Sequence, residues 1–205
     1  MKQMLIAMTM IGLTCGLTAR ADDADSLVWC GLDYSKVKMI GTMDFREPDQ
    51  IFPAMLDAWN NLYMQEMIPL MEKERVAPTI KSDVKAVTER NAKASANQVQ
   101  HEDGTSDEMV KPSHITDADV AKIVASYDLK ESSGTGLVFI MDRLVKAQQM
   151  ECYYIVFFDI GSRKVLHSER IVAKAGGIGF RNFWFRPVKD GVARLPKIYN
   201  LAKGK

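Results

Sequence analysis

The chain has 205 residues, of which 47% are hydrophobic and 26% charged, and its formal net charge is +1. A chain of this length can bury about two-thirds of its unfolded surface, so it needs neither a metal nor a dense set of disulfides to fold. Lys and Arg are scattered among the acids, which excludes the basic footprint of a nucleic-acid-binding protein. We therefore expect one globular domain with no nucleic-acid partner.

The first 21 residues have the composition of a secretory signal peptide. Lys2 supplies a positive charge, residues 4–13 form a short apolar stretch, and Ala19-Arg20-Ala21 matches the small-x-small pattern of a cleavage site. The apolar stretch is too short to cross about 30 Å of hydrocarbon, and no later stretch holds 18 consecutive apolar residues. The sequence predicts a periplasmic or secreted protein, with a signal peptide at 1–21, a single domain at 22–205 and no transmembrane segment after cleavage.

Two other interpretations of this segment stay open. One is a buried N-terminal helix. The other is a lipid anchor on Cys15, although Thr14 stands where lipid-modified proteins carry Gly or Ala. The acidic residues that follow the segment favour cleavage. Cleavage removes two basic residues and no acid, so the net charge changes from +1 to about −1.

Two cysteines, Cys30 and Cys152, remain after cleavage. Export places them in an oxidising compartment, where a disulfide persists once formed. Each cysteine also lies within an apolar, strand-like run, which is typical of separate buried thiols. A bridge requires the two Cα atoms to lie within about 7 Å, so the sequence leaves both arrangements open.

The first elements are a strand region and a helix. Residues 27–40 are rich in β-branched and aromatic side chains, which predicts a strand or a bent pair of strands interrupted at Gly31. Apolar residues then recur at spacings of three and four over 49–67, the pattern of an amphipathic helix. We expect Asp49 to cap this helix and Pro69 to end it.

The middle of the chain is less regular. Thr79-Ile80 predicts a short edge strand, and residues 82–99 favour a helix by propensity, although its apolar face is thin. Residues 100–113 are typical of an exposed loop. Thr116 and Asp119 have the spacing of a capping box, which predicts the start of another helix.

The second half changes to a strand period. Three β-rich runs, at 136–145, 151–160 and 165–173, are separated by short gaps and predict an antiparallel meander. A glycine-rich turn leads to a closing helix whose apolar residues face the sheet: Phe183, Trp184, Val188, Val192 and Leu195. This order of elements predicts an α/β (α+β) fold. We expect a two- or three-layer sandwich in which helices cover a mixed sheet ending in the three-stranded meander.

The glycine-rich turn is the sharpest local feature. Gly176, Gly177 and Gly179 precede a helix, where backbone N–H groups and the helix dipole favour an anion. Lys174 and Arg181 would add charged hydrogen-bond donors. The turn follows an antiparallel strand at the end of the chain, so it is neither a dinucleotide site nor a phosphate-binding P-loop. Glycines that let a strand turn tightly onto a helix are the structural alternative.

Histidines and cysteines form no recognisable catalytic or metal site. His101, His114 and His167 are widely separated, whereas a zinc site normally contains a closely spaced pair of ligands. A nucleophilic cysteine paired with one of these histidines is geometrically allowed, but thiols within apolar runs are usually inert. We expect no metal, no cofactor and no catalytic residue among them.

Carboxylates and tryptophans provide two further hypotheses. Asp33, Asp142 and Asp159 could converge as paired carboxylates for hydrolysis, or stand as an ordinary strand and turn residues. Trp29, Trp59 and Trp184 could form a sugar-stacking platform, but Trp59 and Trp184 fall on helical stripes, which favours core packing.

Several segments support a resemblance to exported proteins of Gram-negative bacteria whose function is not characterised. These segments are Gly31 to Ser35 (GLDYS), Glu89 to Ala92 (ERNA) and Lys174 to Trp184 (KAGGIGFRNFW). The turn from Asp159 to Val165 more distantly resembles the periplasmic α/β domains of envelope assembly lipoproteins. Examples are the curli-secretion type and the N-terminal domain of the Tol-system periplasmic protein. The resemblance implies export and an α/β fold, and it implies no activity.

Two classes of function follow from these observations. The first is a non-enzymatic binding or assembly module of the cell envelope. Its partner would be an envelope protein or a small ligand, and self-association into a homo-oligomer is compatible with it. The alternative is an exported hydrolase whose acid and base meet only in the fold. A deep pocket that joins two carboxylates would favour the enzyme, and a shallow surface with exposed apolar groups would favour the module.

Overall fold

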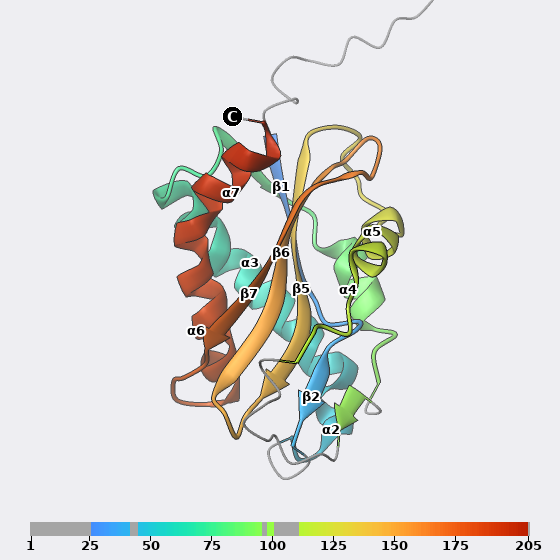
Figure 1. Ribbon diagram of the computed structural model, residues 1–205, viewed down its shortest axis with the longest axis vertical. Helices are drawn as coiled ribbons and strands as arrows, with labels where there is room; N and C mark the ends of the chain where they lie inside the picture. Colours follow the sequence, from blue (N-terminus) through green and yellow to red (C-terminus); the bar gives the residue numbers. More distant parts are fainter. Residues whose placement is uncertain (1–25, 42–44, 96–97, 101–110, 205) are drawn as a thin grey trace, which may run out of the picture.

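One long strand, β5 (Thr135–Val145), runs through the middle of a seven-stranded mixed sheet (Figure 1). This is a computed structural model, and it describes residues 26–41, 45–95, 98–100 and 111–204. The signal peptide and lipid-anchor hypotheses therefore concern residues outside the described ranges. On one side β5 pairs antiparallel with β6 (Met150–Asp159), which pairs in turn with β7 (Val165–Lys174). The predicted meander is confirmed, with every bound within one residue.

The other side of β5 pairs in parallel with two shorter strands. β1 (Ser26–Asp33) lies beside its first half and β2 (Lys38–Ile40) beside its second half. β3 (Thr79–Ser82) extends the sheet next to β1, and β4 (Val99–Gln100) next to β2. The pair of strands expected at 27–40 and the edge strand expected at 79–80 are thus confirmed. The interruption expected at Gly31 is only a shift in pairing register, because β1 continues through it to Asp33.

Helices cover both faces of the sheet, which makes a three-layer sandwich (Figure 1). One face carries three helices and the short helical turns next to them: α2 (Pro48–Gln50), a π-helical turn (Ile51–Met55), α3 (Leu56–Lys73), α6 (Phe180–Gly191), a 3-10 turn (Val192–Arg194) and α7 (Leu195–Ala202). The opposite face carries α4 (Lys85–Asn91) and α5 (Asp117–Ala125). The predicted fold class is therefore confirmed.

Burial explains why β5 and β6 have so few polar residues. Along β6 the odd-numbered Tyr153, Ile155 and Phe157 join the core under α3, α6 and α7. The even-numbered Tyr154, Val156 and Phe158 join the second core under α4 and α5. Because a strand alternates its side chains between two faces, a strand covered on both faces is apolar throughout.

Three local expectations about helices need correction. Pro69 lies inside α3 and does not end it, because the buried stripe continues to Met71 and that packing offsets the missing hydrogen bond. The first helical turn begins at Pro48, and Asp49 lies within it instead of capping it. The helix expected over 82–99 is shorter than predicted and spans only α4, because few residues of this segment are buried.

The capping box at the start of α5 is confirmed. The Thr116 hydroxyl accepts a hydrogen bond from the Asp119 backbone N–H at 3.2 Å, and the Asp119 carboxylate accepts one from the Thr116 N–H at 3.0 Å. Across the part of the chain that the structure describes, no helix combines the length and apolarity needed to cross a membrane.

Candidate functional site

The glycine-rich turn joins β7 to α6 by a sharp change of direction. Gly177 and Gly179 have φ values of +137° and +83°, a region that residues with a Cβ rarely adopt. A Cβ on Gly177 would also lie 3.2 Å from the backbone oxygen of Asn182. Gly179 is the N-cap of α6. The glycines are therefore needed for the path of the chain, whether or not the turn binds a ligand.

Two of the five groups predicted to hold an anion are engaged elsewhere. The Gly176 N–H donates to the Phe183 carbonyl at 3.1 Å. The Arg181 guanidinium forms an ion pair with Glu66, and it lies 5.4 Å and 5.6 Å from the ring centres of Tyr63 and Phe185. This leaves Lys174 and the amides of Gly177 and Gly179 as candidate donors, and the anion site stays a prediction.

Two adjoining cavities open beside this turn. One, of about 450 Å³, is lined by Glu66, Gly176, Gly177, Asn182, Phe185, Arg186, Lys189 and Asp190. The other, of about 390 Å³, is lined by Gln149, Ala173, Lys174, Ala175, Gly176, Arg186 and Asp190. Opposite charges neighbour each other along these walls, with Arg186 3.8 Å from Asp190 and Lys189 3.7 Å from Glu66. Such mixed walls suit a polar chain better than a ligand of one charge.

Ile178 projects from the tip of the same turn. Its side chain is 93% exposed, whereas the other large hydrophobic residues on the described surface are at most 49% exposed. It lies between two glycines in left-handed conformations, so no neighbouring side chain shelters it. Sequence reasoning treated this turn as a set of hydrogen-bond donors or as a tight connection, and it missed Ile178. A lone β-branched residue among glycines was the available signal. Ile178 and the two cavities are called the turn surface below.

Asp33 belongs to a buried network that holds the bend between β1 and β2. Its carboxylate accepts hydrogen bonds from Arg90 Nε at 3.0 Å, from the Tyr127 hydroxyl at 2.8 Å and from the Ser35 N–H at 2.8 Å. Asn91 accepts from the Tyr34 N–H at 2.7 Å and donates to the Leu32 carbonyl at 2.9 Å. The segments GLDYS and ERNA thus meet in space, and each of these polar groups has a partner. The network has the properties of a structural support.

Asp142 lies in a second polar cluster, two residues along β5 from Ile140, the pairing partner of Asp33. Its fully buried carboxylate is 2.8 Å from His114 Nδ1 and 3.2 Å from Arg170 Nη2. Burial by itself raises the pKa of Asp142, but contacts with His114, Arg143 and Arg170 outweigh it and leave the pKa below its ordinary value. The Nε2 atom of His114 lies 2.8 Å from the Lys36 carbonyl oxygen, so this nitrogen is not available as a base.

The three aspartates share no hydrogen-bond or ion-pair partner among the described contacts. Asp159 lies in the β6–β7 turn, where it accepts hydrogen bonds from the Ser162 N–H at 2.7 Å and from the Ser162 hydroxyl at 2.6 Å. Asp33 and Asp142 belong to the separate networks described above. Among the described residues no group of His, Cys, Asp and Glu could hold a metal ion, and His101 lies outside them.

Cys30 and Cys152 are free, buried thiols, so the disulfide left open by the sequence is not formed. Cys30 lies on β1 between the residues that pair with Leu137 and Val138 of β5, whereas Cys152 pairs with Arg143 of β5. At about 3.3 Å per residue, these positions are roughly 16 Å apart along the strand. Burial raises the pKa of Cys152 to about 11, although Arg170 lies 3.1 Å from its sulfur. Neither thiol is activated as a nucleophile.

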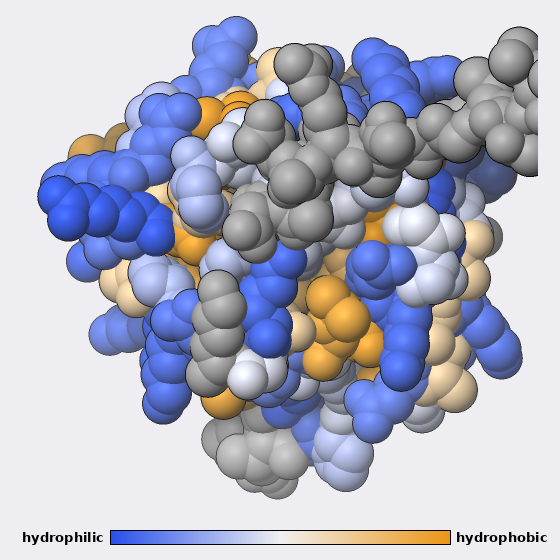
Figure 2. Space-filling view, turned by 90° about the horizontal axis from the view of Figure 1, so that it is seen from above, coloured by the Kyte–Doolittle hydropathy of each residue, from blue (hydrophilic) through white to orange (hydrophobic). Residues whose placement is uncertain are grey.

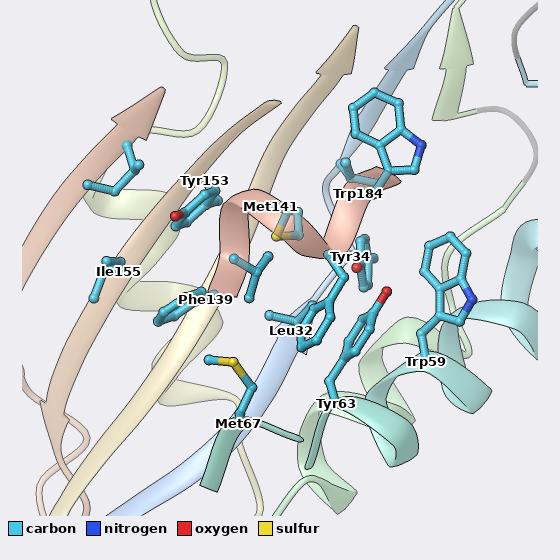
Figure 3. Packing of buried hydrophobic residues seen from close by; sticks show 14 of the residues in the cluster. Leu32, Tyr34, Trp59, Tyr63, Met67, Phe139, Met141, Tyr153, Ile155 and Trp184 are labelled. Atoms are coloured by element: carbon cyan, nitrogen blue, oxygen red, sulfur yellow. The ribbon is translucent and has the colours of Figure 1, made fainter. Parts of the chain in front are cut away.

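The tryptophans are core residues and form no exposed stacking platform. Trp29, Trp59 and Trp184 are at most 4% exposed, and Figure 3 shows the latter two among the packed aromatic side chains. Tyr63 stacks on Phe185 with ring centres 3.9 Å apart. The helical spacing thus indicated core packing correctly.

Glu151 is the polar residue whose environment sequence reasoning missed. It is fully buried on β6, in line with Tyr153 on the same face, and neither carboxylate oxygen has a hydrogen-bond partner among the described residues. Burial raises its pKa well above the ordinary value. The uncharged carboxylic acid is the form that this environment favours.

No family model, curated protein or solved structure matches this chain. The resemblance to exported proteins of Gram-negative bacteria therefore stays a prediction. Function has to be argued from the residues and surfaces described above.

Proposed function

We propose that this chain is an exported binding or assembly module of the cell envelope, and that it engages a protein partner through the turn surface. The observation that carries the proposal is Ile178, an apolar side chain held almost entirely in solvent beside two cavities. An exposed apolar group next to a polar depression is the arrangement in which a partner buries an anchor and pairs its polar groups around it.

The walls of the cavities favour a peptide over a small charged ligand. Each carries both signs of charge, and the Arg181 charge is already neutralised by Glu66. A polypeptide presents N–H donors and carbonyl acceptors together, so it can use such a wall without excess charge. Figure 2 shows the molecule from above, and the surface in this view is chiefly hydrophilic, with a small hydrophobic group near its centre.

The hydrolase alternative has less support from the geometry. Its best candidate pair is His114 with Asp142, a base oriented by a carboxylate. The second nitrogen of that histidine faces the Lys36 carbonyl, and the nearby Cys152 sulfur contacts Arg170 instead. A general base needs that nitrogen free to accept a proton from water or a nucleophile. We therefore do not propose a catalytic role for this pair.

Site-specific photo-crosslinking in the native host tests the proposal. A photoreactive amino acid replaces Ile178, and a matched control replaces Ser162, an exposed residue in the turn at the opposite end of β7. We expect a discrete crosslinked protein with the probe at 178 and none with the probe at 162. Absence of a product at 178, or the same products at both positions, contradicts the proposal.

Export is tested separately. Protein recovered from the envelope of the native host should begin at Asp22, as measured by N-terminal sequencing or intact mass. A chain that begins at Met1 contradicts export. A lipid on Cys15 replaces the soluble form of the proposal with a tethered one.

A further inference from the structure

The two edges of the sheet are built differently. On one edge lie β3 and β4, which have four and two residues. On the other lies β7, which has ten residues and pairs only with β6 among the described strands. Proteins protect sheet edges with short strands, prolines or bulges, because an open edge is a template for another strand. The edge at β3 and β4 is protected by its shortness, whereas β7 is long and contains no proline.

A bulge protects only the beginning of β7. The pairing register with β6 shifts between Phe157 and Phe158, where Leu166 is the extra residue. From Ser168 to Lys174 the pairing is regular. This seven-residue segment is therefore the part of the edge that can accept another strand.

The pairing with β6 determines which backbone groups face outward. Ala175 N–H donates to the Gln149 carbonyl at 2.7 Å, which makes residues 149 and 175 a hydrogen-bonded pair. In an antiparallel ladder such pairs alternate, so odd-numbered residues of β7 direct their N–H and C=O groups toward β6. The even-numbered residues, Ser168, Arg170, Val172 and Lys174, direct theirs toward the open edge. Val172 also leaves an apolar side chain 42% exposed there.

We propose that β7 pairs with β7 of a second copy of this chain, antiparallel about a two-fold axis at Ile171. A two-fold axis perpendicular to the sheet places each side chain opposite one on the same face of the second copy. The register is therefore centred on one residue, which lies opposite its own equivalent. In this register Arg170 lies opposite Val172 of the second copy, and Ser168 opposite Lys174. On the other face Glu169 lies opposite Ala173.

Charge selects this register among the neighbouring ones. An axis at Glu169 would place two glutamates directly opposite each other, and an axis at Arg170 would place two arginines so. An axis at Val172 would oppose Arg170 to Lys174. Like charges in directly opposed positions destabilise a sheet. The register centred on Ile171 has none over the regular segment, and it places the Arg170 stem over the exposed Val172.

The surroundings of β7 allow this pairing. α5 contacts the strand from one face and α7 from the other, so the two helices flank the edge. The Arg170 charge is balanced by Asp142, and Glu169 lies 3.9 Å from Arg194. Pairing would make one sheet continuous through both copies. This inference does not rest on the proposed function, because it uses the outward backbone groups of β7 and not Ile178, although Ala173 and Lys174 at the end of β7 also line one cavity of the turn surface.

The first test removes outward hydrogen bonds without touching β6. Val172→Pro deletes an N–H that faces the open edge, and proline is tolerated at such edge positions. Val172→Thr keeps the N–H and serves as the matched control. In sedimentation experiments at micromolar concentration we expect wild type and Val172→Thr to be dimers and Val172→Pro to be a monomer. A wild type that is monomeric at 100 µM overturns the inference, as does a dimeric Val172→Pro.

The second test reads the register and does not depend on proline. Glu169 and Ala173 of the second copy form a non-hydrogen-bonded pair, whose Cα atoms lie about 4.5 Å apart in a sheet, within disulfide range. Under mild oxidation the double variant Glu169→Cys/Ala173→Cys should form a covalent dimer, and each single variant should not. A covalent dimer of Glu169→Cys alone indicates an axis at Glu169 and overturns this register. No covalent dimer of the double variant overturns the pairing.

Discussion

Replacing Glu151 by Gln is expected to remove a pH-dependent loss of stability. The carboxyl group is fully buried without a partner among the described residues, and burial raises its pKa well above the ordinary value of 4.5. The folded protein therefore keeps the proton at pH values where the unfolded chain releases it. Because the unfolded state then binds fewer protons, the free energy of unfolding falls as pH rises, by about 1.4 kcal/mol for each pH unit. The loss begins near pH 4.5 and ends when pH reaches the raised pKa.

Urea unfolding between pH 4 and pH 8 measures this slope. The Glu151→Gln variant should unfold with nearly the wild-type free energy at pH 4 and become progressively more stable than wild type above pH 5. Glu151→Leu, which also removes the unpaired polar group, should gain about 1–3 kcal/mol even at pH 4. Glu72→Gln, at an exposed position of α3, is the matched control and should leave the slope unchanged. A wild-type slope retained in Glu151→Gln would refute the reasoning, because the pH-dependent loss would then come from a group other than the Glu151 carboxyl.

Three further outcomes are expected. Gly136→Ala should cost about 1–3 kcal/mol or more in chemical unfolding, because its Cβ would lie 2.1 Å from the buried Phe158 ring; equal stability would show that the ring moves aside. Asn91→Ala should cost about 1–3 kcal/mol by leaving the buried Tyr34 N–H without an acceptor, whereas Lys93→Ala, on the exposed side of the same segment, should cost little. Cys30 and Cys152 should react with a thiol reagent only on unfolding, and a peptide that joins them in mass spectra of unreduced protein would contradict the free thiols.

The fold was largely predictable from the sequence because burial leaves a strong pattern. β5 and β6 are covered on both faces, so their apolar runs and the short gaps between the meander strands indicated both the type and the order of these elements. Helix ends were harder to predict. Pro69 breaks a local rule, and only the burial of Met67 and Met71 on either side shows why α3 continues past it. The local cost of a proline in a helix can be inferred from the sequence, but the tertiary packing that offsets this cost cannot.

The sequence predicted the position of the candidate site, but it did not predict which groups its charged residues contact. The glycines correctly marked the turn before α6, because left-handed backbone conformations require them. The partner of Arg181 was not predictable, since Glu66 lies 115 residues away in the sequence and reaches it only through the packing of α3 against α6. The ion pair between Asp33 and Arg90 was not predictable for the same reason, because the two residues are far apart in the sequence. This contact gives Asp33 a structural role.

Buried charges that have partners within the chain and apolar side chains left in solvent differ in what they indicate about a binding partner. Asp33 and Asp142 are buried charges, and each is surrounded by donors from distant parts of the chain, so folding alone accounts for them. Val172, near the end of β7, and Ile178, beyond it, are apolar residues that the described chain leaves 42% and 93% exposed. Departures from local rules that the fold does not compensate are expected at functional sites. In the two proposals above, the compensation comes from outside the chain, from a partner at the turn surface and from a second copy along β7.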